Sequence, residues 1–203
     1  MRSFITSFLL FSAGFAYSMG HKSPVVVPSP VPVASPMPAP SGFVPKVSFE
    51  PVEYYTTDAE RAKIAAAGLK AAEVIQGDCL FQFLSHRALI QTGGQSPLEV
   101  ATRVQNLTGV VPVEMYYRPM WLTSAVAYRN VGENTIHLNR AWFTTARSDC
   151  EWAATLGHES YGHSLGGYDH DFKWSPSRSF SVPYSIGGAD KAQGGSAFDR
   201  CCQ

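Results

Sequence analysis

The sequence predicts an α+β domain in which helices pack on a small, mostly antiparallel sheet. Helix starts are marked by capping boxes, in which a Ser or Thr and a Glu three residues later satisfy the first free N–H groups of a helix. These boxes lie at 57–60, 96–99 and 148–151. Strands are indicated by short β-rich segments on either side of a turn at 130–134. These segments are 110–118, 125–129 and 135–138.

Glycines and apolar periodicity set the extent of the expected helices. Apolar residues recur at helical spacing until a glycine interrupts them, as Gly77 and Gly109 do. Pro97 strengthens the start of the third helix, because proline is favoured at the first helical position. The expected helices cover 57–76, 79–90, 97–108 and 148–163.

Three segments organise the chain. Residues 1–16 combine a basic start, an apolar run and a small-x-small cleavage site, which predicts a signal peptide. The alternative is an uncleaved membrane anchor, but the run is shorter than the roughly 20 residues that cross a bilayer. Residues 17–45 form a proline-rich linker, since 24–45 hold eight of the 14 prolines and no charge. The remaining residues, 46–203, are expected to form one domain.

The charge balance excludes several partners. The chain has 16 Lys and Arg against 16 Asp and Glu, so it lacks the basic surface that nucleic acids or anionic membranes require. We expect no nucleic-acid partner and no stable membrane insertion after signal cleavage. A monomer that acts on a peptide or protein substrate fits this composition.

The four cysteines fit an exported protein. Cys79, Cys150, Cys201 and Cys202 make an even set, as is typical of disulfide-bonded secreted domains. A bridge between neighbouring cysteines is strained, so Cys201 and Cys202 are each expected to reach back to Cys79 or Cys150. The alternative, four thiolates around a metal ion, lacks paired CxxC spacing.

A histidine cluster carries the chemical signal. Three of the six histidines, His158, His163 and His170, fall within thirteen residues. Catalytic zinc (Zn²⁺) takes three protein ligands and keeps a fourth position for water, whose pKa it lowers to about 7. Glu159 lies beside the first histidine, where a carboxylate can accept the proton of that water. The cluster therefore predicts a hydrolytic zinc site.

The spacing of the first two histidines is unusual. His158 and His163 are five residues apart, which on an ideal helix separates their side chains by about 140°, whereas four residues separate them by about 40°. One metal ion can bind both only if the helix widens. A π-bulge inserts one such residue and is found mainly at functional sites, and Gly162 tolerates the distortion.

The segment 158–163, His-Glu-Ser-Tyr-Gly-His, resembles the active-site helix of zincin metallopeptidases. Their motif is HExxH, and the longer form here is similar to the HELLGH signature of the dipeptidyl peptidase III family, in which both histidines bind zinc. The resemblance implies a zincin-like fold, with the active-site helix after an edge strand. One departure is that no Met follows Met120, whereas the metzincin branch places a methionine beneath its metal.

Two residues compete for the third ligand position. In the metzincin branch a glycine turn follows the motif, and by that count Gly166 supplies the turn and Asp169 the ligand. His170 is the other candidate, if Gly166 and Gly167 lengthen the turn by one residue. We favour His170, because imidazole is the commoner zinc ligand. Asp169 or Asp171 would then orient a ligand histidine.

The zincin resemblance also suggests residues of a substrate cleft. The segment 134–139, with Ile136 at its centre, is expected to be the edge strand that pairs with an extended peptide. Further along, Tyr184 is a candidate to hydrogen-bond the oxyanion of the reaction, and Arg178 to bind a substrate carboxylate.

The sequence thus predicts a secreted or periplasmic zinc peptidase, in which metal-activated water cleaves a peptide bond with Glu159 as the general base. One alternative is a peptidoglycan amidase or endopeptidase, because the same chemistry serves any amide. Another is a non-catalytic module, which either binds zinc or is a disulfide-stapled interaction domain.

Overall fold

The computed structural model describes residues 42–143, 147–170, 175–188 and 191–202. The expected signal peptide and most of the expected linker lie outside these ranges. Residues 42–45 contain no helix or strand, and β1 begins at Val47. Contact with the rest of the domain starts at Val44, whose carbonyl accepts a hydrogen bond from the Gln76 side chain.

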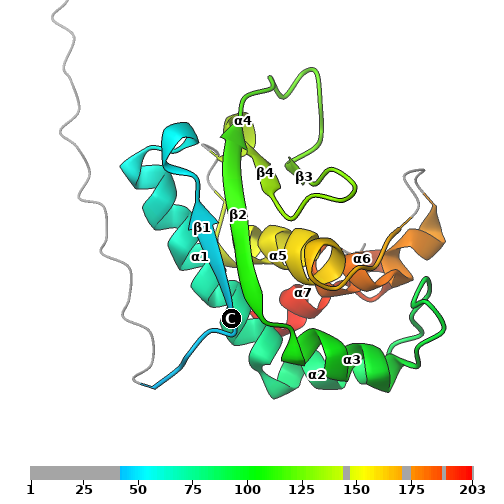
Figure 1. The fold of residues 1–203 in the computed structure, drawn as a ribbon. Helices are drawn as coiled ribbons and strands as arrows, with labels where there is room; N and C mark the ends of the chain where they lie inside the picture. The colour runs from blue at the N-terminus through cyan, green and yellow to red at the C-terminus, as the bar shows by residue number, and fades with distance from the viewer. Residues whose placement is uncertain (1–41, 144–146, 171–174, 189–190, 203) are drawn as a thin grey trace, which may run out of the picture. The chain divides into compact units, whose positions relative to one another are not determined.

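One sheet of four strands has the order β1-β2-β4-β3 (Figure 1). The strands are β1 (Val47–Pro51), β2 (Gly109–Tyr116), β3 (Ala127–Tyr128) and β4 (Ile136–Asn139). The α+β class is confirmed, but the expectation of a mostly antiparallel sheet is wrong. β1 and β4 both run parallel to β2, and only β3 runs antiparallel, to β4.

The parallel pairing has a simple cause. Parallel neighbours need a long crossover connection, and the first three helices supply it between β1 and β2. β1 was not among the expected strands, although Val47 and Phe49 alternate with polar residues and both are buried. The parallel pairing of β2 with β4 was missed as well, although both segments were expected strands; residues 117–135, which include β3, connect them.

In the described ranges, seven α-helices pack on the sheet or on one another. They are α1 (Asp58–Gln76), α2 (Asp78–Ser85), α3 (Pro97–Asn106), α4 (Arg140–Phe143), α5 (Asp149–Gly157), α6 (Val182–Ile186) and α7 (Ala197–Cys201). All three predicted capping boxes are confirmed, with both reciprocal hydrogen bonds present in each. A fourth box, Ser196 with Asp199, opens α7 and was missed because its acid is Asp rather than Glu. None of the helices in the described ranges is long and apolar enough to cross a membrane.

The second helix is shorter than expected. It was predicted to reach residue 90 but ends at Ser85. The chain beyond it is held by tertiary contacts, because Ile90 pairs with Ser181 in a parallel bridge and the Arg87 side chain donates to the Ser179 carbonyl. These contacts outweigh the apolar periodicity of the segment.

The core lies between the sheet and two long helices. α1 packs against α5 and also against β1, behind the strands in the view of Figure 1. Alternate residues of β2, namely Val111, Val113 and Met115, point into this core. Trp152 of α5 is its largest fully buried side chain. The core therefore fixes α5, which leads directly into the histidine cluster.

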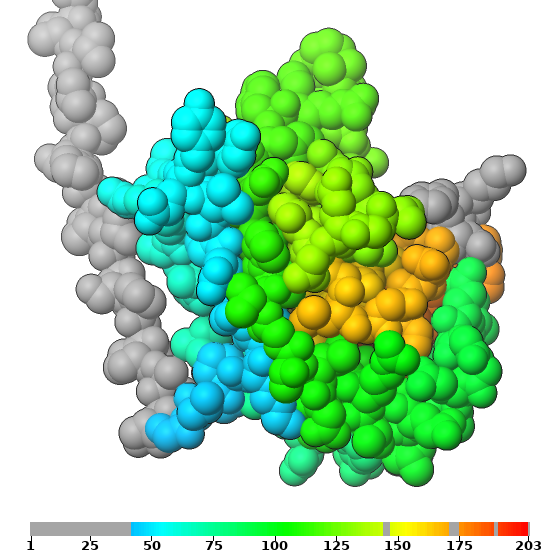
Figure 2. All heavy atoms as spheres, viewed as in Figure 1, coloured from blue at the N-terminus to red at the C-terminus, as the bar shows by residue number. Residues whose placement is uncertain are grey.

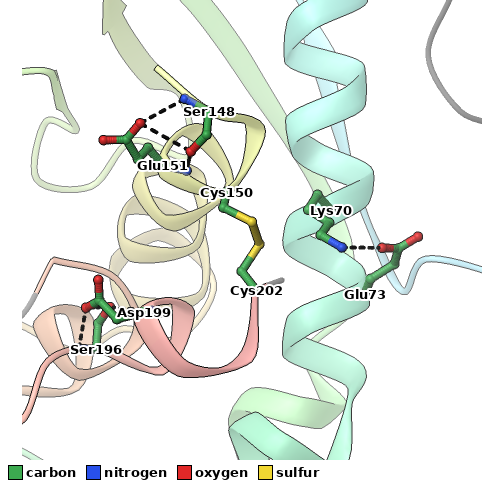
Figure 3. The surroundings of a disulfide bond; sticks show 8 residues. All are labelled: Lys70, Glu73, Ser148, Cys150, Glu151, Ser196, Asp199 and Cys202. Atoms are coloured by element: carbon green, nitrogen blue, oxygen red, sulfur yellow. Dashed lines mark hydrogen bonds and ion pairs between the residues drawn. A yellow bond between two sulfur atoms is a disulfide. The ribbon is translucent and has the colours of Figure 1, made fainter. Parts of the chain in front are cut away.

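Two disulfides tie the C-terminus to the domain. Cys201 is bonded to Cys79 in α2. Cys202 is bonded to Cys150 in α5, as Figure 3 shows. This confirms the prediction that each of the neighbouring cysteines reaches back to one of the other two. Disulfides of this kind are common in extracellular proteins. Cys150 is the second residue of α5, the helix that leads into the histidine motif.

Candidate metal centre

The helix widens at the histidine motif. After α5 the chain continues as a π-helix over His158–Ser164, in which the Leu165 N–H donates to the Ser160 carbonyl at 2.8 Å. A π-helix bonds each N–H to the carbonyl five residues earlier, so side chains five apart lie on the same side. The predicted widening is confirmed, and it brings the side chains of His158 and His163 together.

Two glycines allow this local structure. A Cβ added at Gly162 would lie 2.7 Å from Pro183 of α6, so only glycine lets α6 pack on the π-helix. A Cβ at Gly166 would lie 2.0 Å from the Tyr161 carbonyl oxygen, because the chain turns back sharply here. Gly167 then adopts a φ of +72°, which favours glycine, and the turn carries the chain back toward the motif.

Three imidazoles converge at the end of the π-helix. One ring nitrogen from each of His158, His163 and His170 lies within 4.8 Å of the others. The ring centroids are 5.1 Å apart for His158 and His163, 5.4 Å for His158 and His170, and 4.8 Å for His163 and His170. Two nitrogens on one tetrahedral zinc ion are about 3.4 Å apart. The triad can hold a metal ion after a small inward movement of the rings.

Backbone carbonyls orient two of the three rings. His158 Nδ1 lies 2.8 Å from the Gly187 oxygen, and His163 Nδ1 lies 2.6 Å from the Tyr168 oxygen. A carbonyl only accepts, so each Nδ1 carries the proton and donates it. Nε2 is then left as the lone-pair nitrogen on both rings, which is the usual arrangement of metal-binding histidines.

Burial shifts the pKa values of the site in a direction that suits cation binding. It lowers the pKa of His158 well below the ordinary value and that of His163 to about 4, so both rings are neutral near pH 7. Burial also raises the pKa of Glu159 to about 7, against the opposing charge of Arg129. A carboxyl group with this pKa can both accept and return a proton near neutral pH.

The two downstream residues singled out from the sequence lie at this site. The ring of Tyr184 is 4.7 Å from that of His158 and 4.8 Å from that of His170. Burial raises the pKa of Tyr184, which keeps its hydroxyl a donor. The Arg178 guanidinium lies over the Tyr184 ring, 4.3 Å from its centroid. Helix α6 and the turn before it thus form a second layer beside the triad.

A cleft of about 710 Å³ opens beside the triad. Residues 123–129, which include β3, line one side, and α5 and the π-helix line the other. In the space-filling view, the green to yellow-green residues that include this stretch lie beside the orange residues that follow the π-helix (Figure 2). The cleft gives the histidines access to a ligand larger than water.

The expected edge strand was assigned to the wrong segment. Ile136 is fully buried, because β4 lies between β2 and β3 and turns this side chain into the core. It cannot contact a substrate. The edge position belongs to β3, whose residues Ala127 and Tyr128 both line the cleft.

Some residues of the site were beyond the reach of sequence reasoning. Gly187 holds His158 through its carbonyl, and the sequence gives no signal for a backbone acceptor. Only glycine fits at this position, because a Cβ there would lie 2.1 Å from the Ala154 oxygen. Asp169, the alternative third ligand, lines the cleft but lies outside the group of three. Asp171 lies outside the described residues.

No model of a known protein family matches the chain, and neither the curated proteins nor the solved structures gave a match. The fold and the site therefore carry the functional argument. They define an α+β domain with a histidine triad that could hold a metal ion, at the edge of a cleft.

Proposed function

We propose that the protein is an exported zinc-dependent peptidase. The observation that carries this proposal is the π-helix, which places His158 and His163 on one side together with His170 and leaves Glu159 beside them. The resemblance of 158–163 to the zincin motif suggests the same chemistry. The two disulfides and the sequence pattern of residues 1–16 support export.

The ligand set favours catalysis over a structural role. A structural zinc site usually closes with four protein ligands, whereas a catalytic site has three and an open position. Within the part of the chain that the structure describes, the cluster of possible ligands comprises the three histidines and no fourth group. The cleft beside it leaves room for a substrate.

Each residue of the site has a role in peptide hydrolysis. Zinc in the triad would supply activation of a water molecule and polarisation of the scissile carbonyl. Glu159 removes a proton from the attacking water and returns it to the leaving amine. The Tyr184 hydroxyl donates a hydrogen bond to the oxyanion that forms at the carbonyl. The free edge of β3 offers backbone groups to an extended substrate.

The first test is the zinc content of the purified protein after metal loading. We expect one zinc per chain, its loss in His163→Ala, and its retention in His86→Ala, a matched control because His86 is an exposed histidine at the end of α2. Glu159→Gln should keep the metal and lose about 10²- to 10⁴-fold in peptide hydrolysis. A zinc-free wild type would support a non-catalytic module instead. Cleavage of muropeptides but not of peptides would indicate the cell-wall alternative.

A further inference from the structure

Three arginines line the cleft without a carboxylate partner. Arg129, Arg147 and Arg178 all face it, and none forms an ion pair within the described ranges. Two of the acids along the same cleft are already engaged. Glu151 and Asp199 each accept hydrogen bonds in the capping boxes that open α5 and α7. Four acids also line the cleft, but two of these carboxylates already accept hydrogen bonds, whereas the three guanidinium groups form no ion pair within the described ranges.

Arg129 directly follows β3, and part of its guanidinium group is held in place. Its Nη1 donates to the Glu133 carbonyl at 3.1 Å, and its Nε is enclosed. Nη2 has no hydrogen-bond partner among the residues that the structure describes. A guanidinium has five N–H donors in a rigid fork, so a fixed arginine with free donors is prepared for an anion.

Arg178 lines the same cleft beside Tyr184. Its Nε is also enclosed, and its guanidinium rests on the Tyr184 ring. The charges of the two arginines act on different groups. That of Arg129 acts on Glu159 and His163, and that of Arg178 on His158 and Tyr184. The two guanidinium groups thus act on different members of the site.

Arg147 differs from the other two. Its guanidinium stacks on two indoles, 5.3 Å from the ring centroid of Trp142 and 5.5 Å from that of Trp152. Its charge is not among those acting on the histidines or on Glu159. It lines the same cleft but packs on aromatic rings away from the triad, which makes it a matched control.

We propose that Arg129 and Arg178 form a clamp that selects substrates bearing a carboxylate next to the scissile amide. Arg129, which directly follows the edge strand, is a specificity residue that the proposed function did not include. The carboxylate is either the end of a peptide chain or an acidic side chain, and Arg forks match both. The cleavage part of this inference rests on the proposed function, whereas the binding part does not.

The binding part is tested on the metal-free protein by calorimetry. The probes are acetyl-tetraalanine with a free C-terminal carboxylate, the same peptide as its C-terminal amide, and an amide-ended peptide with one Glu. We expect a carboxylate-bearing probe to bind roughly ten- to hundredfold more tightly than the neutral amide. Preference for the first or the third probe identifies which carboxylate is read. Equal affinities, or no binding of any probe, would overturn the clamp.

Variants assign that preference to the two arginines. Arg129→Gln and Arg178→Gln should each remove most of it, and Arg147→Gln should change it less than twofold. Arg129→Lys keeps the charge and should retain part of it, with thermal unfolding confirming that each variant is folded. If the preference survives in Arg129→Gln, the edge-strand arginine is not the anion site and the proposal fails.

Kinetics on the zinc-loaded protein separates this proposal from the proposed function. Arg129→Gln should raise KM for the carboxylate substrate about tenfold or more with little change in kcat, because a contact made equally before and during reaction affects binding alone. Cleavage of neutral and anionic peptides at equal rates in wild type and variants would keep the peptidase and reject the clamp. Arg-dependent binding without any cleavage would keep the clamp and reject the peptidase.

Discussion

The two sides of the cleft are built in different ways. The helix wall, which comprises α5, the π-helix, α6 and α7, is closely packed and joined by disulfides. The strand wall, residues 117–135 with β3, is thin and exposed. Trp121 is 82% exposed and Val131 is 88% exposed in this wall. The three histidines that could hold a metal ion belong to the first wall or to the turn that follows it, and Arg129 belongs to the second.

Close backbone approaches hold the helix wall together. Gly157, which precedes the first histidine, has Phe198 of α7 where a Cβ would lie, at 2.8 Å. Gly187 approaches Ala154 of α5 in the same way. The strand wall has no comparable packing, since β3 has only two residues and pairs with β4 alone. We therefore expect the helix wall to fix the geometry of the proposed metal site, and the strand wall to tune the affinity for the proposed substrate.

The largest effect should come from the disulfides of the helix wall. The Cys79–Cys201 bridge spans 122 residues and the Cys150–Cys202 bridge spans 52. Loop-closure entropy predicts that replacing each pair by serine costs about 5 and about 4 kcal/mol of unfolding free energy. Urea titration of the two variants, each with one cysteine pair replaced by serine, measures which loss of unfolding free energy is larger. Equal losses, or losses below about 1 kcal/mol, would mean that packing alone holds α7 on the domain.

Gly187→Ala should have the next largest effect. Its Cβ would meet the Ala154 oxygen at 2.1 Å and displace the carbonyl that orients His158, so we expect a loss of about 3 kcal/mol together with weaker zinc binding. Gly132→Ala in the strand wall is the control. Gly132 has a φ of +86° and open space around it, so it should cost only about 1–2 kcal/mol and leave the zinc affinity unchanged. Thermal unfolding and zinc titration compare the two.

The features of the helix wall that the sequence predicted are local ones. The widened helix follows from a five-residue spacing with a glycine inside it, and the disulfide pattern follows from adjacent cysteines. The contacts of Gly187 could not be predicted, because a backbone carbonyl carries no side-chain signal. Arg129 was missed for another reason. It matters only because β3, rather than β4, forms the edge, and that order depends on the parallel pairing of β4 with β2, which lie apart in the sequence.

Glu159, in the π-helix of the helix wall, gives a pH-dependent test. Its pKa is raised from 4.5 to about 7 in the folded protein, so the stability it contributes is full below pH 4.5 and is lost as pH rises through 7. The lowered pKa of His163, about 4, acts in the opposite direction, since its contribution is lost as pH falls from 6.5 toward 4. Glu159→Gln removes only the first effect.

Without metal, the stability of Glu159→Gln relative to wild type should therefore be greater at pH 8 than at pH 5. The expected difference is roughly 2 kcal/mol after allowance for solvent screening. Urea unfolding at the two pH values, with metal removed, measures it. A gain of the same size at both pH values would show that the carboxyl group titrates normally and is not poised as a base.

Asn139 provides the smallest expected effect and the sharpest contrast between the walls. It is fully buried at the end of β4, and its side chain accepts from the backbone N–H groups of Arg118 and Ala141, both at 3.1 Å. It also donates to the carbonyls of Arg118 at 2.9 Å and Ala125 at 3.4 Å. One side chain thus fastens both ends of the long loop between β2 and β3.

Asn139→Ala should loosen the strand wall alone. We expect a loss of about 1–2 kcal/mol, an unchanged zinc affinity and a severalfold rise in KM for peptides, because the edge strand is less well placed. Asn134→Ala is the matched control, since its exposed side chain donates one hydrogen bond to the Val110 carbonyl at 2.8 Å and should cost less. If Asn139→Ala weakened zinc binding as much as peptide binding, the metal centre would depend on both walls. Independent responses would mean that the chemistry is set by one wall and the choice of substrate by the other.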